Sequence, residues 1–336
     1  MQYCVYTRSY YEQPYLNFFI EHYYKLGFNK IVILQSDDIE YNPPEEFSHI
    51  VEIHHIENIG NDALPKYDYL VKNRFHWILC VDIDEILLLH QSYQNINHYV
   101  ETMLDTYPKL TTFYFRWGMI EKYDIFPTFR FRDVLKQYHM YSNVHIKSMV
   151  RSSHLKSIDH PHICTVRDTQ IYFEGSILKE NNPCHPVSIL SYKDHVLVHL
   201  HTRSIHNLII KSMCTCLHNK NIVSKEGITK LVNEYSDSDI DETILDMFKQ
   251  TIGQKSIIPF RHADSEKCDL NASIFPVFVY KYRIIDQKKE DALIDIFLTK
   301  YNITNLLNDY KLLLDLCLPN QIFSLLFHEI HLSVLV

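Results

Sequence analysis

The chain has 336 residues, of which 46% are hydrophobic and 22% are charged, with 24 Tyr, 18 Phe and a formal net charge of −8. This composition is globular and leaves room for one large domain, or for one domain and a sizeable extension. The negative charge gives no electrostatic case for nucleic acid binding. The 6 glycines, with neither a Rossmann fingerprint nor a P-loop, disfavour a fold that relies on a glycine-rich phosphate loop.

The 8 cysteines are scattered without zinc-knuckle spacing, which is typical of a reduced, intracellular protein. The sequence begins directly with a strand-like segment and shows no charged region followed by an apolar signal region. No uninterrupted apolar span reaches membrane length. We therefore expect a cytoplasmic protein without a transmembrane segment.

The first elements predict a βαβ unit. Residues 2–6 are typical of a strand, and Pro14 stands in the first turn of a predicted helix whose C-cap is Gly27. A second buried strand is predicted over residues 30–35. The crossover between two such parallel strands is right-handed.

The most informative stretch follows a predicted strand at 50–54 and a predicted helix at 62–73. Residues 77–81 are apolar without alternation, which is typical of a strand buried on both faces, and three carboxylates follow at Asp82, Asp84 and Glu85. On a continuing strand Asp82 and Asp84 project to the same side and can share one cation, with Glu85 turning away as the strand ends. Oxygen ligands favour Mg or Mn over Zn. The alternative is a charged strand end that faces solvent.

Polar residues follow several of these strands, at the edge where open α/β sheets bind ligands. We expect three groups to converge there, namely Thr7 with Arg8, Asp37 with Asp38, and the carboxylates Asp82, Asp84 and Glu85. For Asp37 and Asp38 a plain turn is the alternative, since Ser-Asp-Asp is good turn chemistry.

The remainder of the chain carries weaker patterns. Residues 126–150 are aromatic and basic and indicate either a flap over an anionic ligand or a solvated hairpin. Residues 152–186 are predicted as an irregular, functional or mobile loop. The other predicted elements are helices at 96–106, 204–213, 244–251, 292–301 and 304–316, and strands at 111–117 and 196–201. We expect a domain over residues 1–221 and a mainly helical extension of unknown role over 222–336.

Three motifs occur in a specific order along the chain. The segment 12–28 resembles the motif N-E-x-x-Y-L, although Tyr11 replaces Asn and Phe18-Phe19 replaces Glu-Trp. Residues 77–85 resemble W-x-x-x-x-D-x-D-E. Residues 199–204 resemble H-Y-x-T-K-S, with Leu200 and Arg203 in place of Tyr and Lys. In this order the motifs resemble those of GT-A fold glycosyltransferases of the family-2-like superfamily, and above all family 92. The resemblance covers residues 2 to about 215 and implies a Rossmann-like, mostly parallel sheet flanked by helices.

The resemblance implies a metal-dependent transfer of sugar, with inversion, from a nucleotide-diphosphate sugar, above all UDP-linked, to a hydroxyl of a glycan, a protein or a small molecule. A Mn or Mg ion would stabilise the diphosphate leaving group. The implied metal ligands are Asp84, Asp82 and His199, with His201 as the fallback; a satisfied core histidine is the alternative for His199. The residues implied in nucleotide-sugar binding are Thr7, Arg8, Glu12, Asp37, Asp82, Arg203 and Lys211.

An inverting displacement needs a general base for the acceptor hydroxyl, and the sequence does not single one out. Of the available acids we favour Asp159 and Glu121. His160 and His162 lie in the loop that we expect to cover the acceptor, or are simply solvated. The other candidates are Asp124, Asp168 and Asp194.

Two other classes compete with a transferase. The departures at Tyr11, Phe18 and Leu200 fit a non-catalytic binding or scaffold protein with a degenerate transferase fold. A divalent-metal phosphohydrolase is disfavoured, because haloacid-dehalogenase-type enzymes need a run with Ser or Thr after D-x-D, and residues 85–87 are Glu-Ile-Leu. The low glycine content with abundant Tyr, Ile, Asn and Lys suggests an AT-rich genome, such as that of a large DNA virus.

Overall fold

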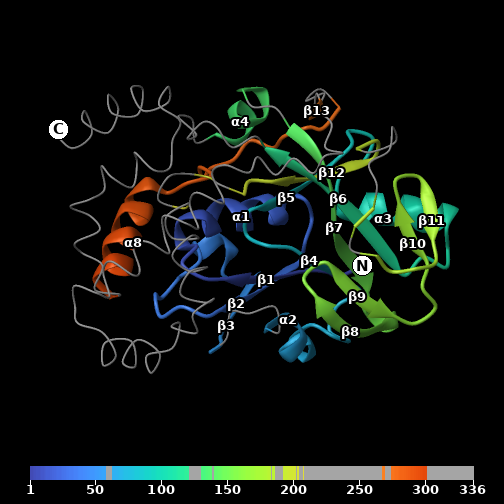
Figure 1. Ribbon diagram of the computed structural model, residues 1–336, viewed down its shortest axis with the longest axis horizontal. Helices are drawn as coiled ribbons and strands as arrows, with labels where there is room; N and C mark the ends of the chain where they lie inside the picture. Colours follow the sequence, from blue (N-terminus) through green and yellow to red (C-terminus); the bar gives the residue numbers. More distant parts are fainter. Residues whose placement is uncertain are drawn as a thin grey trace, which may run out of the picture. The chain divides into compact units, whose positions relative to one another are not determined.

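The computed structural model describes residues 1–57, 63–120, 130–137, 140–182, 184–185, 192–201, 203, 207, 267–268 and 274–300 (Figure 1). The chain divides into two compact units. The first unit comprises Met1–Arg203 with Arg261–Lys289, and the second comprises Ser204–Phe260 with Glu290–Val336. The predicted boundary between 221 and 222 lies outside the described residues. The sheet and the candidate site belong to the first unit.

One half of the sheet is parallel. It runs in the order β3-β2-β1-β4, and every neighbouring pair is parallel. β1, β2 and β4 are buried along most of their length, as the unalternating apolar runs predict, whereas β3 at the edge is only partly buried. Their bounds are Tyr3–Ser9 for β1, Lys30–Gln35 for β2, Val51–His55 for β3 and Trp77–Cys80 for β4.

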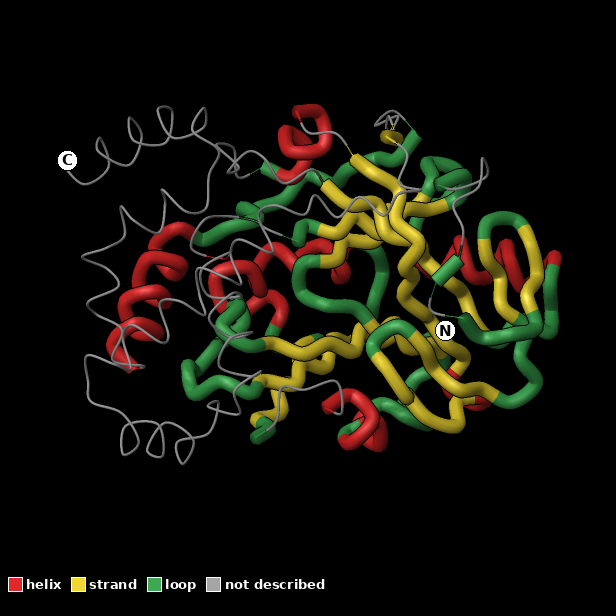
Figure 2. Tube along the Cα trace, viewed as in Figure 1, coloured by secondary structure: helices red, strands yellow, loops and turns green. Residues whose placement is uncertain are grey.

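The other half of the sheet is mixed. β7 (Met140–Arg151) lies antiparallel between β4 and β6 (Thr112–Ile120). β6 also pairs in parallel with β10 and β12, and β12 pairs antiparallel with β5. The remaining bounds are Glu85–Leu89 for β5, Ile171–Phe173 for β10, Ser176–Leu178 for β11, His195–His199 for β12 and Lys267–Cys268 for β13. The described residues thus form an 11-stranded sheet with helices on its flanks (Figure 2), which confirms the predicted α/β class.

The prediction of an irregular loop over residues 152–186 was wrong. After η3 (Ser152–His154), β8 (Leu155–His160) and β9 (Ile163–Val166) form a separate antiparallel hairpin, and β10 and β11 follow it. Leu155, Ile158, Cys164 and Val166 of the hairpin are buried in the same apolar cluster as residues of β1 and β4. Burying this alternating face holds the hairpin against the sheet.

Two of the predicted helices form as expected. In α1 (Gln13–Lys25), Pro14 stands in the first turn, and Gly27 follows the C-terminus with φ +99°, a conformation that favours glycine. In α3 (Ile96–Thr106), the side chain of Asn95 caps the first turn by accepting a hydrogen bond from the backbone N–H of His98 at 2.9 Å.

The helix predicted over 62–73 was wrong in extent. α2 covers Ala63–Lys66 and the 3-10 turn η2 covers Asp68–Leu70, and Asn73 adopts φ +61°, which no α-helix accommodates. The remaining described helices are η1 (Glu45–Phe47), α4 (Phe131–Gln137) and α8 (Gln287–Lys300). The helix predicted at 292–301 falls on α8 up to residue 300. Those predicted at 244–251 and 304–316 lie outside the described residues, as does 204–213 except for Asn207.

A segment from late in the chain packs on α1. We call residues 274–289 the strap. The carboxylate of Glu21 accepts hydrogen bonds from the backbone N–H groups of Lys281 and Tyr282, both at 2.8 Å, and Tyr280 Oη lies 2.9 Å from His22 Nδ1. Glu21 and His22 are 2% and 0% exposed, so the strap provides partners that these buried polar groups need.

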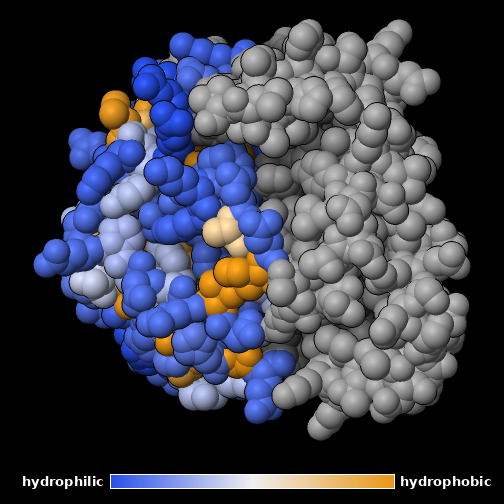
Figure 3. All heavy atoms as spheres, turned by 90° about the vertical axis from the view of Figure 1, so that its left-hand side faces the viewer, coloured by the Kyte–Doolittle hydropathy of each residue, from blue (hydrophilic) through white to orange (hydrophobic). Residues whose placement is uncertain are grey.

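One face of the described part of the chain is mostly polar. On the face shown in Figure 3 the described residues are predominantly hydrophilic, with small apolar patches between them. Within the described part of the chain, no helix has both the length and the apolar character that crossing a membrane requires.

Candidate active site

The candidate site lies where the order of the parallel strands reverses. The chain continues from β1 to β2 and β3 on one side, and then adds β4 on the other side of β1. Open α/β sheets bind ligands outside the carboxyl ends of the strands at such a switch point. Arg8, near the end of β1, and Asp82, just after β4, meet there with Arg8 Nε 3.4 Å from Asp82 Oδ1.

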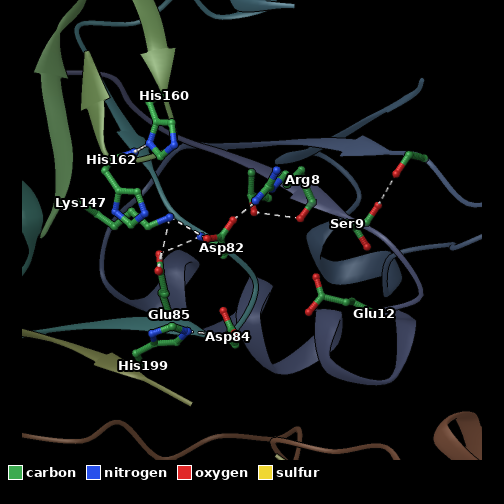
Figure 4. Close-up of polar contacts among 12 residues, drawn as sticks. Arg8, Ser9, Glu12, Asp82, Asp84, Glu85, Lys147, His160, His162 and His199 are labelled. Atoms are coloured by element: carbon green, nitrogen blue, oxygen red, sulfur yellow. Dashed lines mark hydrogen bonds and ion pairs between the residues drawn. The ribbon is translucent and has the colours of Figure 1, made fainter. Parts of the chain in front are cut away.

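The acidic motif forms a turn. β4 ends at Cys80, and the backbone N–H of Glu85 donates to the carbonyl of Asp82 at 3.1 Å, while the Glu85 carboxylate accepts from the backbone N–H of Asp82 at 2.8 Å. The prediction that Asp82 and Asp84 share one face of a continuing strand was therefore wrong. In Figure 4, Asp82 is directed to Arg8 and Lys147, whereas Asp84 is directed to His199.

Lys147, on β7, is the cation at the centre of this arrangement. Its Nζ lies 2.6 Å from Asp82 Oδ2 and 3.4 Å from Glu85 Oε1, and its side chain is fully buried. Burial raises the pKa of the Asp82 carboxyl, but the Lys147 ammonium and the Arg8 guanidinium outweigh burial and hold this pKa well below its usual range. For Glu85 burial prevails, and its pKa is raised well above the usual value despite Lys147.

Lys147 itself stays charged. Burial lowers the pKa of its ammonium, and the carboxylates of Asp82 and Glu85 more than offset this, so that the pKa is raised. The sequence placed Lys147 only within the basic stretch 126–150, as part of a flap or a hairpin. The structure places it on a central strand, where it is buried, and the local sequence carries no signal that separates it from the neighbouring surface cations.

Three buried side chains form a candidate metal centre. Asp84, Glu85 and His199 each offer one ligand atom, and these atoms all lie within 4.8 Å of one another. His199 and Glu85 are opposite each other on the antiparallel strands β12 and β5, which brings the imidazole to the turn. His199 Nε2 lies 3.3 Å from Asp84 Oδ2. The predicted ligands Asp84 and His199 are thus brought together, and Glu85, predicted only to support them, joins the cluster.

The donors of this cluster suit a divalent cation. His199 Nδ1 is buried without a hydrogen-bond partner among the described residues, and Glu85 Oε1 has only its ion pair with Lys147 at 3.4 Å, so both atoms can accept a further partner. Two carboxylates with one imidazole nitrogen are compatible with Mn, whereas a purely oxygen set is what Mg prefers. These residues therefore fit a divalent cation, and their mixed oxygen and nitrogen donors suit Mn better than Mg.

Arg203 links the start of α1 to the acidic turn. Its Nη2 lies 2.6 Å from Glu12 Oε1, its guanidinium carbon lies 3.5 Å from the ring centroid of Tyr15, and its Nη1 lies 3.5 Å from the carbonyl oxygen of Ile83. The side chain is 1% exposed. The predicted contact of Arg203 with a diphosphate stays a prediction, and so does the predicted contact of Glu12 with a nucleotide. Lys211 and Thr202 lie outside the described residues.

Asp37 is engaged within the protein. Its carboxylate accepts hydrogen bonds from the backbone N–H groups of Tyr11 and Ile39 at 2.8 and 3.1 Å, and from the side-chain amides of Gln13 and Gln35 at 2.5 and 3.0 Å. These bonds shape the loop after β2. Thr7 is buried on β1. The predicted nucleotide contacts of both residues stay predictions.

The β8–β9 hairpin carries the histidines that the sequence placed near an acceptor. His160 and His162 lie beside Lys147 in Figure 4. The neighbouring Asp159 is exposed, and its carboxylate accepts hydrogen bonds from the hydroxyls of Ser157 and Thr165. The other favoured base, Glu121, lies outside the described residues.

Comparison with known proteins adds little to this geometry. No family model matches the chain, and none of the curated proteins matches its sequence. Among the solved structures that a structural comparison matches is a CMP:2-keto-3-deoxy-manno-octonic acid synthetase in complex with CTP. It has 11% sequence identity and a TM-score of 0.25, over 46% of this chain and 75% of that chain. The fold and the site themselves define the class, an α/β protein with a candidate metal centre at the switch point of its sheet.

Proposed function

We propose that the chain is a metal-dependent glycosyltransferase that moves a sugar, with inversion, from a UDP-linked donor to a hydroxyl acceptor. The observation that carries this proposal is the buried cluster of Asp84, Glu85 and His199 beside Arg8 and Lys147, at the switch point of the sheet. Together with the sequence resemblance of the acidic and histidine motifs, it supports a nucleotide-diphosphate sugar as the ligand.

The charges of the site suit a diphosphate leaving group. Asp82 and Asp84 carry two negative charges that balance the two positive charges of Arg8 and Lys147, and Glu85, whose pKa burial raises, adds a third negative charge when it is ionised. A divalent cation held by Asp84, Glu85 and His199 would neutralise the charge that develops on the diphosphate.

The protein's own residues then have distinct tasks. Asp82 holds Lys147 and Arg8 in place through its two carboxylate oxygens. Arg8 lies at the rim with 29% of its side chain exposed, and a guanidinium has the donor geometry that phosphate oxygens accept. The residues proposed to contact the nucleotide are Thr7, Glu12, Asp37, Arg203 and Lys211. The proposed base for the acceptor is Asp159 or Glu121.

Thermal unfolding of the full chain with UDP, GDP or CDP, each with and without Mn, tests the proposal. A ligand that binds only the native state raises the midpoint by mass action. We expect one nucleotide to raise it, only with Mn, and we expect Asp84→Asn to abolish this rise. Glu52→Gln, on β3 and paired with Arg74 rather than with the site, is the matched control.

The products separate the proposal from its competitors. With the matching nucleotide sugar, a transferase releases the nucleoside diphosphate. Release of a nucleoside monophosphate would indicate a phosphohydrolase, and binding without any release would indicate a non-catalytic binding protein. The absence of any nucleotide effect on a folded chain would remove the proposal altogether.

A further inference from the structure

Two histidines of the β8–β9 hairpin have fixed and opposite hydrogen-bonding patterns. His162 Nδ1 lies 2.7 Å from the carbonyl oxygen of Ile146. A carbonyl only accepts, so this nitrogen carries the proton and the Nε2 of the neutral ring is an acceptor. His160 Nδ1 accepts from the backbone N–H of His162 at 3.3 Å, so the neutral His160 ring carries its proton on Nε2, which is a donor.

The two rings present these groups side by side. Their centroids are 5.1 Å apart and their planes are inclined by only 22°. Both side chains are partly exposed, and neither Nε2 has a hydrogen-bond partner among the residues that the structure describes. The hairpin therefore offers one acceptor next to one donor.

The pair belongs to the same site as the metal cluster. The indole ring of Trp117 contacts both, with its centroid 4.3 Å from that of His199 and 5.1 Å from that of His162. Lys147, which contacts Asp82 and Glu85, lies 5.8 Å above the same indole ring. A molecule bound at the two Nε2 atoms would thus lie near the place where the donor sugar is proposed.

We propose that His160 and His162 bind two neighbouring hydroxyls of a carbohydrate acceptor, with His162 accepting from one hydroxyl and His160 donating to the other. This inference rests on the proposed function and names the acceptor class. Neighbouring ring hydroxyls of a sugar supply one donor and one acceptor together. A Ser, Thr or Tyr side chain has a single hydroxyl, which would have to lie midway to serve both rings.

The histidines act in recognition and leave the proton of the acceptor to another group. Burial, and then Lys147, lowers the pKa of His162 to about 3, and burial also lowers the pKa of His160. An efficient general base has a pKa near the working pH, so His162 is poorly suited to that task. Its neutral ring instead keeps the acceptor and donor pattern described above.

Histidine-selective nitrogen NMR of the full chain tests the pattern and the ligand. Signals are assigned with His160→Gln and His162→Gln. We expect the Nδ1–H tautomer for His162 and the Nε2–H tautomer for His160. We also expect saturable shifts of both Nε2 signals with the methyl glycosides of glucose, galactose or mannose, and none with cyclohexanol or N-acetylserine amide. Other tautomers, equal shifts with the single-hydroxyl probes, or no shift with any glycoside would overturn the proposal.

Kinetics with a nucleotide-sugar donor and the glycoside that binds give a second readout. Loss of one hydrogen bond should raise the KM for the acceptor roughly fivefold to tenfold in His162→Phe. In His162→Gln, whose amide oxygen still accepts, the rise should be smaller, and His55→Phe, exposed on β3, should match the wild type. An unchanged acceptor KM in a His162→Phe protein that the nucleotide with Mn still stabilises would contradict the proposal.

The two proposals fail in different ways. If no nucleotide stabilises the wild type while glycosides move both histidine signals, the transferase proposal fails and the carbohydrate site stands. If the nucleotide stabilises the wild type with Mn but no glycoside moves the signals, the acceptor inference fails alone.

Discussion

The ammonium of Lys147 lies 2.6 Å from the carboxylate of Asp82, and it joins a fully buried strand position to a side chain that is 29% exposed at the rim of the site. The same ammonium lies 3.4 Å from Glu85, which is fully buried. Burying an isolated charge is very unfavourable, so the lysine and the acidic turn depend on each other. The pair explains how three carboxylates can stand within four residues at the end of a buried strand.

Replacing Lys147 with methionine should destabilise the protein by about 3 kcal/mol, because removal of one partner leaves buried carboxylates uncompensated. Urea unfolding followed by circular dichroism measures the change. Lys25→Met, at a lysine with 35% of its side chain exposed, is the control and should cost less than about 1 kcal/mol. Adding Glu85→Gln to Lys147→Met should restore part of the loss, and a double variant no more stable than the single one would contradict this account.

Metal binding should depend more strongly on Asp84, Glu85 and His199 than on Asp82. Titration calorimetry with Mn should show losses of more than about tenfold to hundredfold in Asp84→Asn, Glu85→Gln and His199→Gln, since even outer-shell changes cost this much. Asp82→Asn should lose less, because Asp82 lies outside the cluster and pairs with Arg8 and Lys147. A larger loss in Asp82→Asn than in Glu85→Gln would instead favour the ligand set expected from the sequence.

The acid stability of the protein should depend on Glu52. Hydrogen bonds from Arg74, opposed by burial and aided by His54, lower the pKa of Glu52 from 4.5 to about 2. A carboxyl whose folded pKa is depressed contributes stability above its unfolded pKa and loses it as the pH falls through the folded pKa. The pair is partly exposed and screened by solvent, so the contribution should be at most about 1 kcal/mol.

Unfolding free energies measured between pH 5 and pH 2 test this effect. This range spans the unfolded pKa of 4.5 and the folded pKa of about 2. Wild type should exceed Glu52→Gln at the upper end, and the difference should shrink markedly toward the lower end. Glu101→Gln, exposed on α3, should show no such convergence. A difference that is independent of pH would refute the assignment.

The strap should contribute measurably to the stability of the first unit. Glu21→Gln replaces one accepting oxygen with an amide that faces the backbone N–H of Lys281 or Tyr282, and an unsatisfied buried donor costs about 1 to 3 kcal/mol. Tyr280→Phe removes the hydrogen bond to His22 and should cost about 1 kcal/mol. Glu46→Gln, at an exposed pair with Lys281, should be nearly neutral in the same thermal unfolding assay.

The regular elements near the start of the chain were predictable from local pattern. The strands β1 and β2, α1 with Gly27 after it, and α3 all follow from apolar periodicity and capping residues. The expectation that polar residues after β1 and β4 meet also holds for Arg8 and Asp82, because parallel strands bring their carboxyl ends to one edge.

The details of the site were not predictable from local pattern. An apolar run followed by acids does not indicate where the strand stops, and the stop here depends on the Glu85 carboxylate bonding back to the Asp82 N–H. Lys147 resembled the surface cations near it in sequence, and its partner Asp82 is 65 residues away. The short strands β8 and β9 were obscured by the polar residues on their outer faces.

The strap has a consequence for how the chain folds as it is synthesised. His22 and Tyr280 are separated by 258 residues, so α1 leaves the ribosome long before the residues that complete its buried face. Contacts between such distant residues also slow folding, because a long loop must close before they form. The nascent chain therefore carries Glu21 and His22 without their final partners through most of translation, and this face of α1 is where a chaperone or a misfolded pairing would compete.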